Sequence, residues 1–341
     1  MHTTENFIRC SHLCIIKNKL TIGGEKSSPI FYLNGYIYTR GDYMLKRFFD
    51  LSGDEIINLN KDELKQSIKA CEARIVLSEN VVVQEPATYG VTSSELAKAF
   101  GADLILLNFF DVNEKKIKGL DYSGVGIIKK LKNLVKRPIG VNLEPVQDKN
   151  MFSEKKAISD GRKASEENIK KLDEMGFDFV MFTGNPGTGV DNEGINEAIK
   201  LAKKHFHGLI FAGKMHSSGV DEKIADLDVY KGFLDAGADV LSVPAVGTCP
   251  GVFDEDVRAI VELAHKNGAL VMTTIGTSQE SSPKEVIRDI ALRNKILGTD
   301  IQHIGDSGYG GLAICENIFE LSRTLRGDRH TFKLMAASIN R

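Results

Sequence analysis

The chain has 341 residues, 42% of them hydrophobic, with 44 basic and 46 acidic side chains. This balance, without a run of like charge, argues against a nucleic acid or an anionic membrane as the partner. Five scattered cysteines do not suit a disulfide framework, and no apolar run is long enough to span a membrane. Because the N-terminus also lacks the apolar core of a signal peptide, we expect a cytoplasmic protein.

The first 43 residues do not share the pattern of the rest of the chain. Within them, residues 30–38 predict a small hairpin with Asn34-Gly35 as its turn. We therefore divide the chain into an N-terminal extension, residues 1–43, and a main domain, residues 44–341. The sequence leaves open whether the extension is an appendage, a dimerisation arm or an upstream segment.

From Leu51 onward one unit recurs along the chain. A helix ends in glycine, an Asp often follows two residues later, and an aliphatic run begins. Glycine suits the left-handed residue that ends a helix, and an aliphatic run without alternation suits a parallel strand buried on both faces. The glycines that mark these units are Gly101, Gly176, Gly237, Gly268 and Gly298.

Three further aliphatic runs complete a set of eight predicted strands, each followed by a helix. The strands are expected near residues 75, 104, 139, 179, 209, 240, 270 and 301. Right-handed βα units at a spacing of about thirty residues close naturally into a (β/α)8 TIM barrel. A doubly wound open sheet is the alternative, but the Gly-rich fingerprint usual in its first βα turn is not seen.

Three predicted helices begin with the spacing of a capping box, in which two residues three positions apart cap each other's backbone N–H groups. The pairs are Asn60 with Glu63, Thr92 with Glu95, and Ser282 with Glu285. In the third pair, Pro283 would also occupy the first helical position, which proline favours. These helix starts agree with the register of the predicted barrel.

The last predicted strand runs into a glycine-rich stretch, residues 305–311, and then into a helix expected from Leu312 to Arg326. Glycines let backbone N–H groups approach a ligand, and a helix N-terminus adds unpaired donors. Residues 276–278 follow the seventh strand, and barrels often seat a phosphate after strands seven and eight. The predicted phosphate or carboxylate site comprises Gly276, Thr277, Ser278, Gly305, Ser307, Gly308, Gly310 and Gly311.

Polar residues crowd the ends of the predicted strands, where barrels carry their chemistry. Glu79, Asp111, Glu144 and Asp306 are candidate general bases or oxygen ligands for a magnesium ion. The alternative for each is a helix cap or an ion pair with a neighbouring Lys. We take Asp111 and Glu144 as the candidate metal ligands, and Glu144 and Asp306 as candidate catalytic residues.

Lys214 and His216 follow the fifth strand and are separated by one residue, so both can point to the same side. A lysine there could bind phosphate or, if desolvated, form a Schiff base, and the histidine could transfer protons. We expect His303, inside the eighth strand, to be a hydrogen-bonded core residue. Residues 184–189 form a second glycine-rich turn, either an anion site or only a tight loop.

Residues 229–274 resemble part of the phosphoenolpyruvate mutase and isocitrate lyase superfamily. The resemblance lies in the strand Gly237-Ala-Asp239-Val-Leu-Ser-Val-Pro244 and in the following helix, which opens with acidic residues. It implies a magnesium-dependent barrel that acts on small α-keto acids or phosphonates. The superfamily's Lys-x-Cys-Gly loop and clustered aspartates are not found here. As a whole, the chain is similar to an uncharacterised family of bacterial barrels.

We therefore expect an enzyme that acts on a small phosphorylated or carboxylated metabolite through an enolate-like intermediate, by lyase or mutase chemistry. Lys214 and His216 would stabilise negative charge, magnesium is the implied cofactor, and no organic cofactor is implied. A Schiff-base aldolase using Lys214 and a non-catalytic barrel that binds a phosphorylated metabolite are the alternatives. Barrels of this kind often form homo-oligomers, and nothing in the sequence marks an interface.

Overall fold

The computed structural model describes residues 46–147, 156–217, 220–306 and 310–340, together with the backbone of four short strands before them. The chain falls into two units, Met1–Lys46 and Arg47–Arg341. In the first unit, β1 (Phe7–Cys10), β2 (Leu13–Ile16), β3 (Ile30–Leu33) and β4 (Tyr36–Thr39) form one sheet. The antiparallel pairing of β3 with β4 confirms the predicted hairpin, although its turn, Asn34-Gly35, lies outside the described residues.

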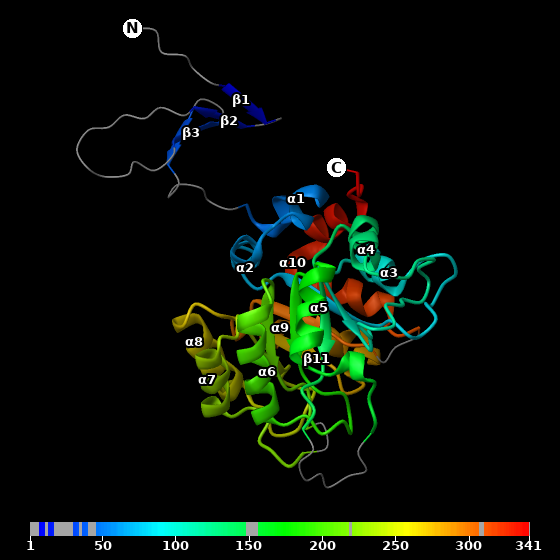
Figure 1. Ribbon diagram of the computed structural model, residues 1–341. Coiled ribbons are helices and arrows are strands. Elements are labelled where there is room, and N and C mark those ends of the chain that lie inside the picture. Colours follow the sequence, from blue (N-terminus) through cyan, green and yellow to red (C-terminus); the bar gives the residue numbers. More distant parts are fainter. Residues whose placement is uncertain are drawn as a thin grey trace, which may run out of the picture. The chain divides into compact units, whose positions relative to one another are not determined.

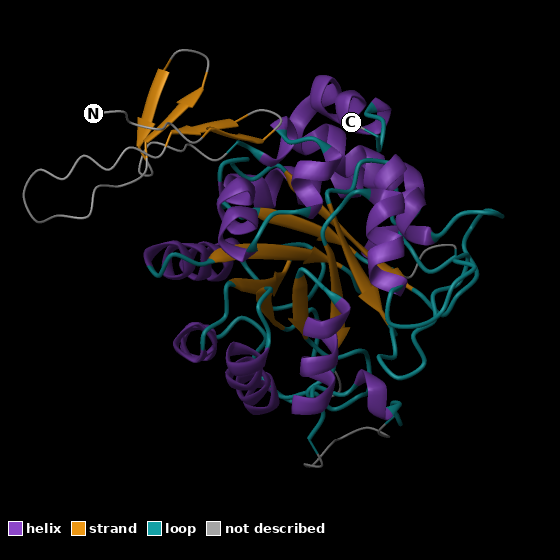
Figure 2. Ribbon diagram, turned by 45° about the horizontal axis from the view of Figure 1, so that its top comes forward, coloured by secondary structure: helices purple, strands orange, loops and turns teal. Residues whose placement is uncertain are grey.

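In the second unit, eight parallel strands close into a barrel surrounded by helices (Figures 1 and 2). This confirms the predicted TIM barrel, and every strand begins where the aliphatic runs place it. The strands are β5 (Ile75–Val81), β6 (Leu104–Asn108), β7 (Ile139–Leu143), β8 (Phe179–Phe182), β9 (Leu209–Gly213), β10 (Val240–Pro244), β11 (Leu270–Ile275) and β12 (Ile301–Ile304).

Helices α1 (Gly53–Ile57) and α2 (Lys61–Lys69) precede the first barrel strand. The helices between strands are α3 (Ser93–Ala99), α4 (Ile127–Val135), α5 (Glu166–Met175), α6 (Asn192–His205), α7 (Leu227–Ala236), α8 (Asp254–Lys266) and α9 (Lys284–Ile296), and α10 (Cys315–Ala336) follows the last strand. Short 3-10 turns are η1 (Phe48–Asp50), η2 (Asp160–Arg162) and η3 (Gln279–Ser281). Across the described ranges, no helix combines the length and the apolar character needed to cross a membrane.

The predicted helix starts are confirmed in two of three cases. Capping boxes form at Asn60 and at Thr92. The prediction for Ser282 is wrong, because α9 begins at Lys284 with Pro283 as its N-cap. The carbonyl of Ser282 instead accepts a hydrogen bond from the Asn317 side chain of α10, at 2.8 Å. Helix α10 itself begins at Cys315 rather than at Leu312.

The Asp residues of the recurring unit have a structural task at the amino-terminal end of the barrel. Each lies just before one strand, and its carboxylate accepts a backbone N–H near the start of the preceding strand. The four bonds are Val76 to Asp103 (2.9 Å), Ile139 to Asp178 (2.7 Å), Ile210 to Asp239 (3.0 Å) and Val271 to Asp300 (2.8 Å). These hydrogen bonds join neighbouring strands at the amino-terminal end of the barrel.

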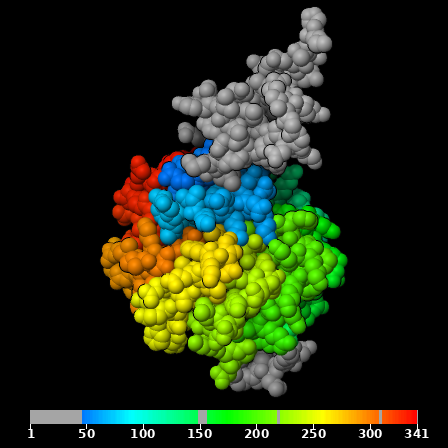
Figure 3. Space-filling model, turned by 90° about the vertical axis from the view of Figure 1, so that its left-hand side faces the viewer, coloured from blue at the N-terminus to red at the C-terminus, as the bar shows by residue number. Residues whose placement is uncertain are grey.

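The hydrophobic core has two parts separated by the strands. One part lies between the strands and the helices, and the other fills the barrel interior. The interior is closed at its amino-terminal end by Phe48 and Phe49 of η1 and by Ile56, Leu64 and Ile68 of α1 and α2. Figure 3 shows this segment, in blue, spread across one end of the barrel unit. The opposite end is therefore the open one.

Gly140 of β7 makes room for an aromatic ring inside the barrel. A Cβ atom added at Gly140 would lie 2.1 Å from Cε2 of Phe179, on the neighbouring strand. The Phe179 ring also packs against Phe211, with the ring centroids 4.8 Å apart. The aromatic rings of Phe179 and Phe211 thus fill the space that a side chain at position 140 would otherwise occupy.

Candidate active site

The side chains that face the barrel interior alternate along each strand. On β5, Ile75 and Leu77 belong to the interior core, and Glu79 is the next residue on that face. The same alternation brings further polar side chains to the interior near the carboxyl-terminal ends of the strands, namely Asn108, Asn142, Thr183 and His303.

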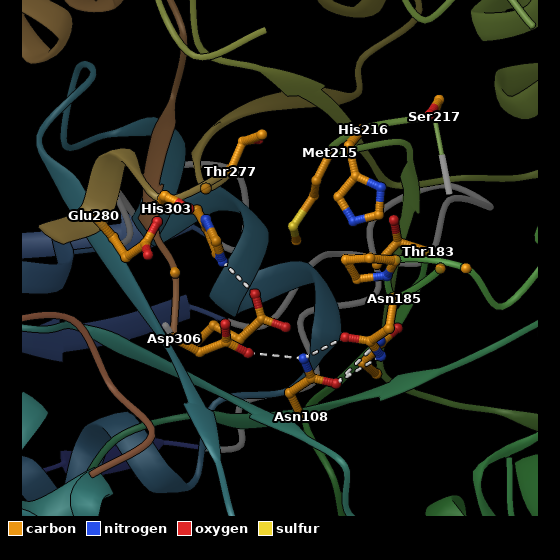
Figure 4. Close-up of a pocket in the computed structure, with 18 residues that line it drawn as sticks. Asn108, Thr183, Asn185, Met215, His216, Ser217, Thr277, Glu280, His303 and Asp306 are labelled. Carbon is orange, nitrogen blue, oxygen red and sulfur yellow. Dashed lines mark hydrogen bonds and ion pairs between the residues drawn. The ribbon is translucent and has the colours of Figure 1, made fainter. Parts of the chain in front are cut away.

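These side chains line a cavity of about 410 Å³ at the carboxyl-terminal mouth of the barrel (Figure 4). Loops after the strands supply the rest of its wall. They contribute residues 184–187 after β8, 215–217 after β9, 276–278 and Glu280 after β11, and Gly305 with Asp306 after β12. The cavity therefore lies where barrels carry their chemistry.

A hydrogen bond joins Glu79 to His303 in the cavity wall. Glu79 Oε2 lies 2.8 Å from His303 Nε2, and both side chains are buried. Burial, with the nearby charges of Glu144 and Glu280, raises the pKa of Glu79 to about 8. Burial also lowers the pKa of His303 to about 4, against the opposing charges of Asp306 and Glu280. The pair is therefore uncharged at neutral pH.

His303 was expected to be a hydrogen-bonded core residue. It is hydrogen-bonded and fully buried, and it also lines the cavity. Its second ring nitrogen, Nδ1, has no hydrogen-bond partner among the residues that the structure describes.

A network of side-chain amides holds Asp306 on the same wall (Figure 4). Asn108 Nδ2 donates to Asp306 Oδ2 at 2.8 Å and to Asn185 Oδ1 at 3.0 Å. Asn185 Nδ2 in turn donates to Asn108 Oδ1 at 3.1 Å. Burial and the charge of Glu79 raise the pKa of Asp306 to about 6, although the hydrogen bond from Asn108 and the proximity of His303 oppose this rise. The network positions Asp306 before any ligand binds.

Two further lining residues carry polar atoms without a partner. Asn142 Oδ1 and Thr183 Oγ1 are buried and make no hydrogen bond with any described residue. A buried polar atom that makes no hydrogen bond costs about 1–3 kcal/mol. Together with His303 Nδ1, these atoms give the cavity wall an unused capacity for hydrogen bonds, as a site for a polar molecule requires.

The structure brings part of the predicted anion site to the cavity. Gly276, Thr277, Ser278 and Gly305 all line it. Thr277 and Ser278 both have left-handed backbones, with φ of 60° and 71°, which is uncommon outside glycine. Ser307 and Gly308 lie outside the described residues.

Gly310 and Gly311 do not line the cavity, and both have packing roles. A Cβ added at Gly310 would lie 2.4 Å from the backbone nitrogen of Ala87. The Gly311 carbonyl accepts the N–H of Val81 at 2.7 Å. These two glycines therefore let the chain pass close to the loop that follows β5.

Lys214 and His216 have different surroundings. Strand β9 ends at Gly213, so the strand alternation that would place both on one side does not extend to them. Lys214 is buried, forms an ion pair with Glu222, and is not among the lining residues. His216 lines the cavity, and its burial, with the nearby charge of Lys214, lowers its pKa against the influence of Glu144.

Glu144 and Asp111 support loops and do not line the cavity. The Glu144 carboxylate pairs with Arg162 and accepts the N–H of Asn185 at 3.0 Å, so it holds the loop after β8. Asp111 Oδ1 accepts the N–H groups of Asn113, at 2.7 Å, and of Glu114, at 3.1 Å.

These contacts do not fit the magnesium site that the resemblance implies. Hydrogen-bond donors already occupy Glu144 and Asp111, the two candidate metal ligands. Among the described residues, no group of three or more His, Cys, Asp or Glu side chains is placed to hold a metal ion.

Several lining residues were not singled out from the sequence, namely Asn108, Asn142, Thr183, Asn185 and Glu280. Asn108 follows from counting in twos along β6 from the interior residues Leu104 and Leu106, whereas Asn142 and Thr183 come two residues after Gly140 and Met181, where the aliphatic signal is missing. Asn185 and Glu280 lie in loops, where no periodicity indicates which side chain faces the cavity.

A closed (β/α)8 barrel with a polar cavity at its carboxyl-terminal mouth has the architecture on which barrel enzymes are built. The chain belongs to the family described as a domain of unknown function (DUF7916), whose model matches residues 49–341. No curated protein matches the sequence.

Solved structures with a similar fold include three barrels. An archaeal fructose 1,6-bisphosphate aldolase has a TM-score of 0.47 and 14% identity, covering 75% of this chain and 95% of its own. Thiamine phosphate pyrophosphorylase from Pyrococcus furiosus has a TM-score of 0.45 and 14% identity, covering 75% and 97%. A 2,3-dimethylmalate lyase of the PEP mutase/isocitrate lyase superfamily has a TM-score of 0.43 and 11% identity, covering 74% and 81%. These values are too low to bear on reaction or substrate.

Proposed function

We propose that the protein is an enzyme of the lyase or isomerase class that moves protons on a small polar substrate in the mouth cavity. The observation that supports this most is the hydrogen-bonded pair of Glu79 and His303 beside a third titratable group, Asp306. Sites that run acid and base chemistry at neutral pH commonly contain groups whose surroundings shift their pKa values.

The roles follow from the charge states. Asp306, with a pKa of about 6, is mostly ionised at pH 7 and can remove a proton from a carbon next to a carbonyl group. The uncharged pair of Glu79 and His303 then returns a proton, so the substrate loses one and gains one. Thr183 Oγ1 would donate to a substrate oxygen, and Asn142 Oδ1 would accept a hydrogen bond from a substrate hydroxyl group. His216 lies across the cavity from His303 (Figure 4) and would face the other side of the substrate.

The substrate suited to this wall carries a carbonyl group and at most a single carboxylate. Besides the uncharged Glu79, the lining holds two carboxyl groups, Glu280 and Asp306, and the described lining residues include no Lys or Arg. A phosphate dianion would be repelled by such a wall, whereas a singly charged carboxylate is repelled less. The backbone at residues 276–278 and at Gly305 is the part of the wall that can seat the carboxylate.

The Schiff-base alternative has less support. It needs Lys214 as a neutral amine in the cavity, whereas this lysine is ion-paired with Glu222 and is not among the lining residues. A non-catalytic barrel would use the same cavity for binding alone, and it predicts binding without any proton exchange.

Hydrogen–deuterium exchange at carbon tests the proposal without knowledge of the full reaction. The protein is incubated in D2O with a panel of α-keto and α-hydroxy acids, and NMR detects deuterium next to the carbonyl group. We expect exchange with at least one compound, and a loss of about a hundredfold or more in Asp306→Asn. The same substitution at the exposed Asp235 is the matched control and should retain exchange.

Two outcomes count against the proposal. Exchange at the wild-type rate in Asp306→Asn would remove that residue as the base. Binding detected by thermal shift, with no exchange for any bound compound, would favour the non-catalytic barrel.

A further inference from the structure

A second cavity, of about 480 Å³, lies at the other end of the barrel unit. Its wall is formed by residues 49–53, 55 and 56 of the segment containing η1 and α1, by Lys98 of α3, by Lys136 and Arg137 after α4, and by residues at the end of α10. These segments lie together in Figure 1, close to the C-terminus. The same η1 and α1 segment closes the amino-terminal end of the interior core, so this cavity and the mouth cavity share no residue.

Four of the lining residues are basic, namely Lys98, Lys136, Arg137 and Lys333. Two of them already have partners. Lys136 Nζ lies 2.8 Å from Asp54, and Lys333 Nζ donates to the carbonyl of Phe49 at 2.7 Å. Lys136 and Lys333 both line the cavity, but each already has a partner in the protein.

The acidic residues of the wall are occupied elsewhere. Glu55 Oε2 accepts the N–H of Ser52 in the cap of α1, at 2.8 Å. Asp50 Oδ2 lies 2.8 Å from Arg47, while its other oxygen is 3.7 Å from Lys333. Neither carboxylate therefore pairs with Lys98 or Arg137.

Lys98 and Arg137 are the two basic lining residues that form no ion pair with any residue that the structure describes. The Lys98 ammonium group makes no hydrogen bond or ion pair with any residue that the structure describes. Arg137 is 4% exposed and donates to two backbone carbonyls, those of Ala102 and Lys136. The charge of Asp103 acts favourably on Arg137, but Asp103 forms its ion pair with Arg326.

Their mutual effect is repulsive. Burial and the charge of Arg137 lower the pKa of Lys98. Two like charges held at one cavity without a carboxylate between them destabilise the folded chain unless an anion joins them. The guanidinium fork of an arginine and the point charge of a lysine are both common ligands of phosphate oxygens.

We propose that this cavity binds a small free polyanion of the phosphate or pyrophosphate class, with Lys98 and Arg137 as its main ligands and Lys136 and Lys333 at the rim. The inference is independent of the proposed function, because it uses none of the residues of the mouth cavity.

Calorimetric titration of inorganic phosphate and of pyrophosphate into the full chain tests this site. We expect binding by the wild-type protein and a Kd at least about tenfold weaker for Lys98→Gln. Lys98→Arg keeps the charge and should retain binding. Lys129→Gln, on an exposed position of α4, removes the same charge outside the cavity and is the matched control.

Three results would overturn the proposal. These are wild-type affinity in Lys98→Gln, an equal loss in Lys129→Gln, and no binding of either probe by the wild-type protein up to about 10 mM. Circular dichroism confirms that each variant is folded. If Lys98→Gln does not fold, the test uses Lys333→Gln, which removes a charge at the rim of the cavity. This variant should weaken pyrophosphate binding about threefold or more.

Discussion

Glu79 and His303 show how burial sets the charge states of two hydrogen-bonded side chains. Neither side chain can become charged inside the wall without a large cost of desolvation. The pKa of the acid therefore rises to about 8 and that of the base falls to about 4. Burial at the ends of the barrel strands therefore keeps Glu79 protonated and His303 neutral at pH 7.

This charge state predicts how stability depends on pH. A carboxyl group whose pKa is raised by folding stabilises the folded chain fully below its unfolded pKa, and that stability is lost as pH rises through the folded pKa. For Glu79 this window runs from 4.5 to about 8. For Asp306 the loss of stability is complete just above its folded pKa of about 6. His303 has a lowered pKa, so its contribution to stability increases as the pH rises from about 4 to 6.5. Above pH 6.5, Glu79 is the one of these three groups that still titrates.

We therefore expect the wild-type free energy of unfolding to fall between pH 6.5 and 8, by up to about 1.4 kcal/mol per pH unit. Glu79→Gln cannot ionise and should show a flatter dependence in urea unfolding. Glu174→Gln, at an exposed position, should keep the wild-type slope. Identical slopes in all three proteins would mean that Glu79 is ionised in the folded state.

The same scale explains which site residues could be predicted from the sequence. The loop residues Gly276, Thr277, Ser278 and Gly305 were predicted, because glycine and small polar residues after a strand are visible as a pattern. After the second barrel strand, the sequence indicates Asp111 as a candidate because carboxylates are common metal ligands and bases. The interior face, set by alternation, is what brings Asn108 to the cavity and leaves Asp111 in a loop.

At the scale of elements, the barrel is held by contacts that repeat from strand to strand. Each Asp that precedes a strand accepts an N–H from the strand before it. The sequence showed this Asp as part of a recurring pattern, but the bonds join residues that lie 27 to 39 positions apart in the chain. Spacing alone could not reveal its partner.

Asp300 gives the clearest test of these contacts. Its carboxylate accepts the N–H of Val271 at 2.8 Å and lies 2.9 Å from His265 Nε2. We expect Asp300→Ala to lower the free energy of unfolding by about 1–3 kcal/mol, since a buried N–H loses its partner. Asp254→Ala breaks an exposed pair with Arg293 and should cost about 1 kcal/mol or less. Equal effects of the two substitutions in chemical denaturation would contradict this difference.

At the scale of the whole molecule, the barrel unit contains its own core and both cavities. The strand positions could be predicted because eight similar units repeat the same signal. The N-terminal residues gave a correct hairpin but no function, since four short strands carry no residue pattern that indicates a ligand.

A chain that begins at Arg47 should therefore fold as the barrel. All eight barrel strands and the residues that close the interior lie after this point. We expect its Tm to lie within about 3 °C of that of the full chain, which corresponds to about 2 kcal/mol for a unit of this size. A large loss of Tm in differential scanning calorimetry would show that residues 1–46 contribute to the stability of the barrel.

The close approach of Gly140 and Phe179 has a consequence for how this barrel can change over evolution. Any side chain at position 140 would occupy the space of the Phe179 ring. A larger residue at 140 is thus tolerated only with a smaller one at 179, because core packing conserves total volume. A larger residue at 140 alone would overfill the interior, and a smaller residue at 179 alone would leave a cavity. Relatives of this chain should therefore show correlated substitutions at positions 140 and 179.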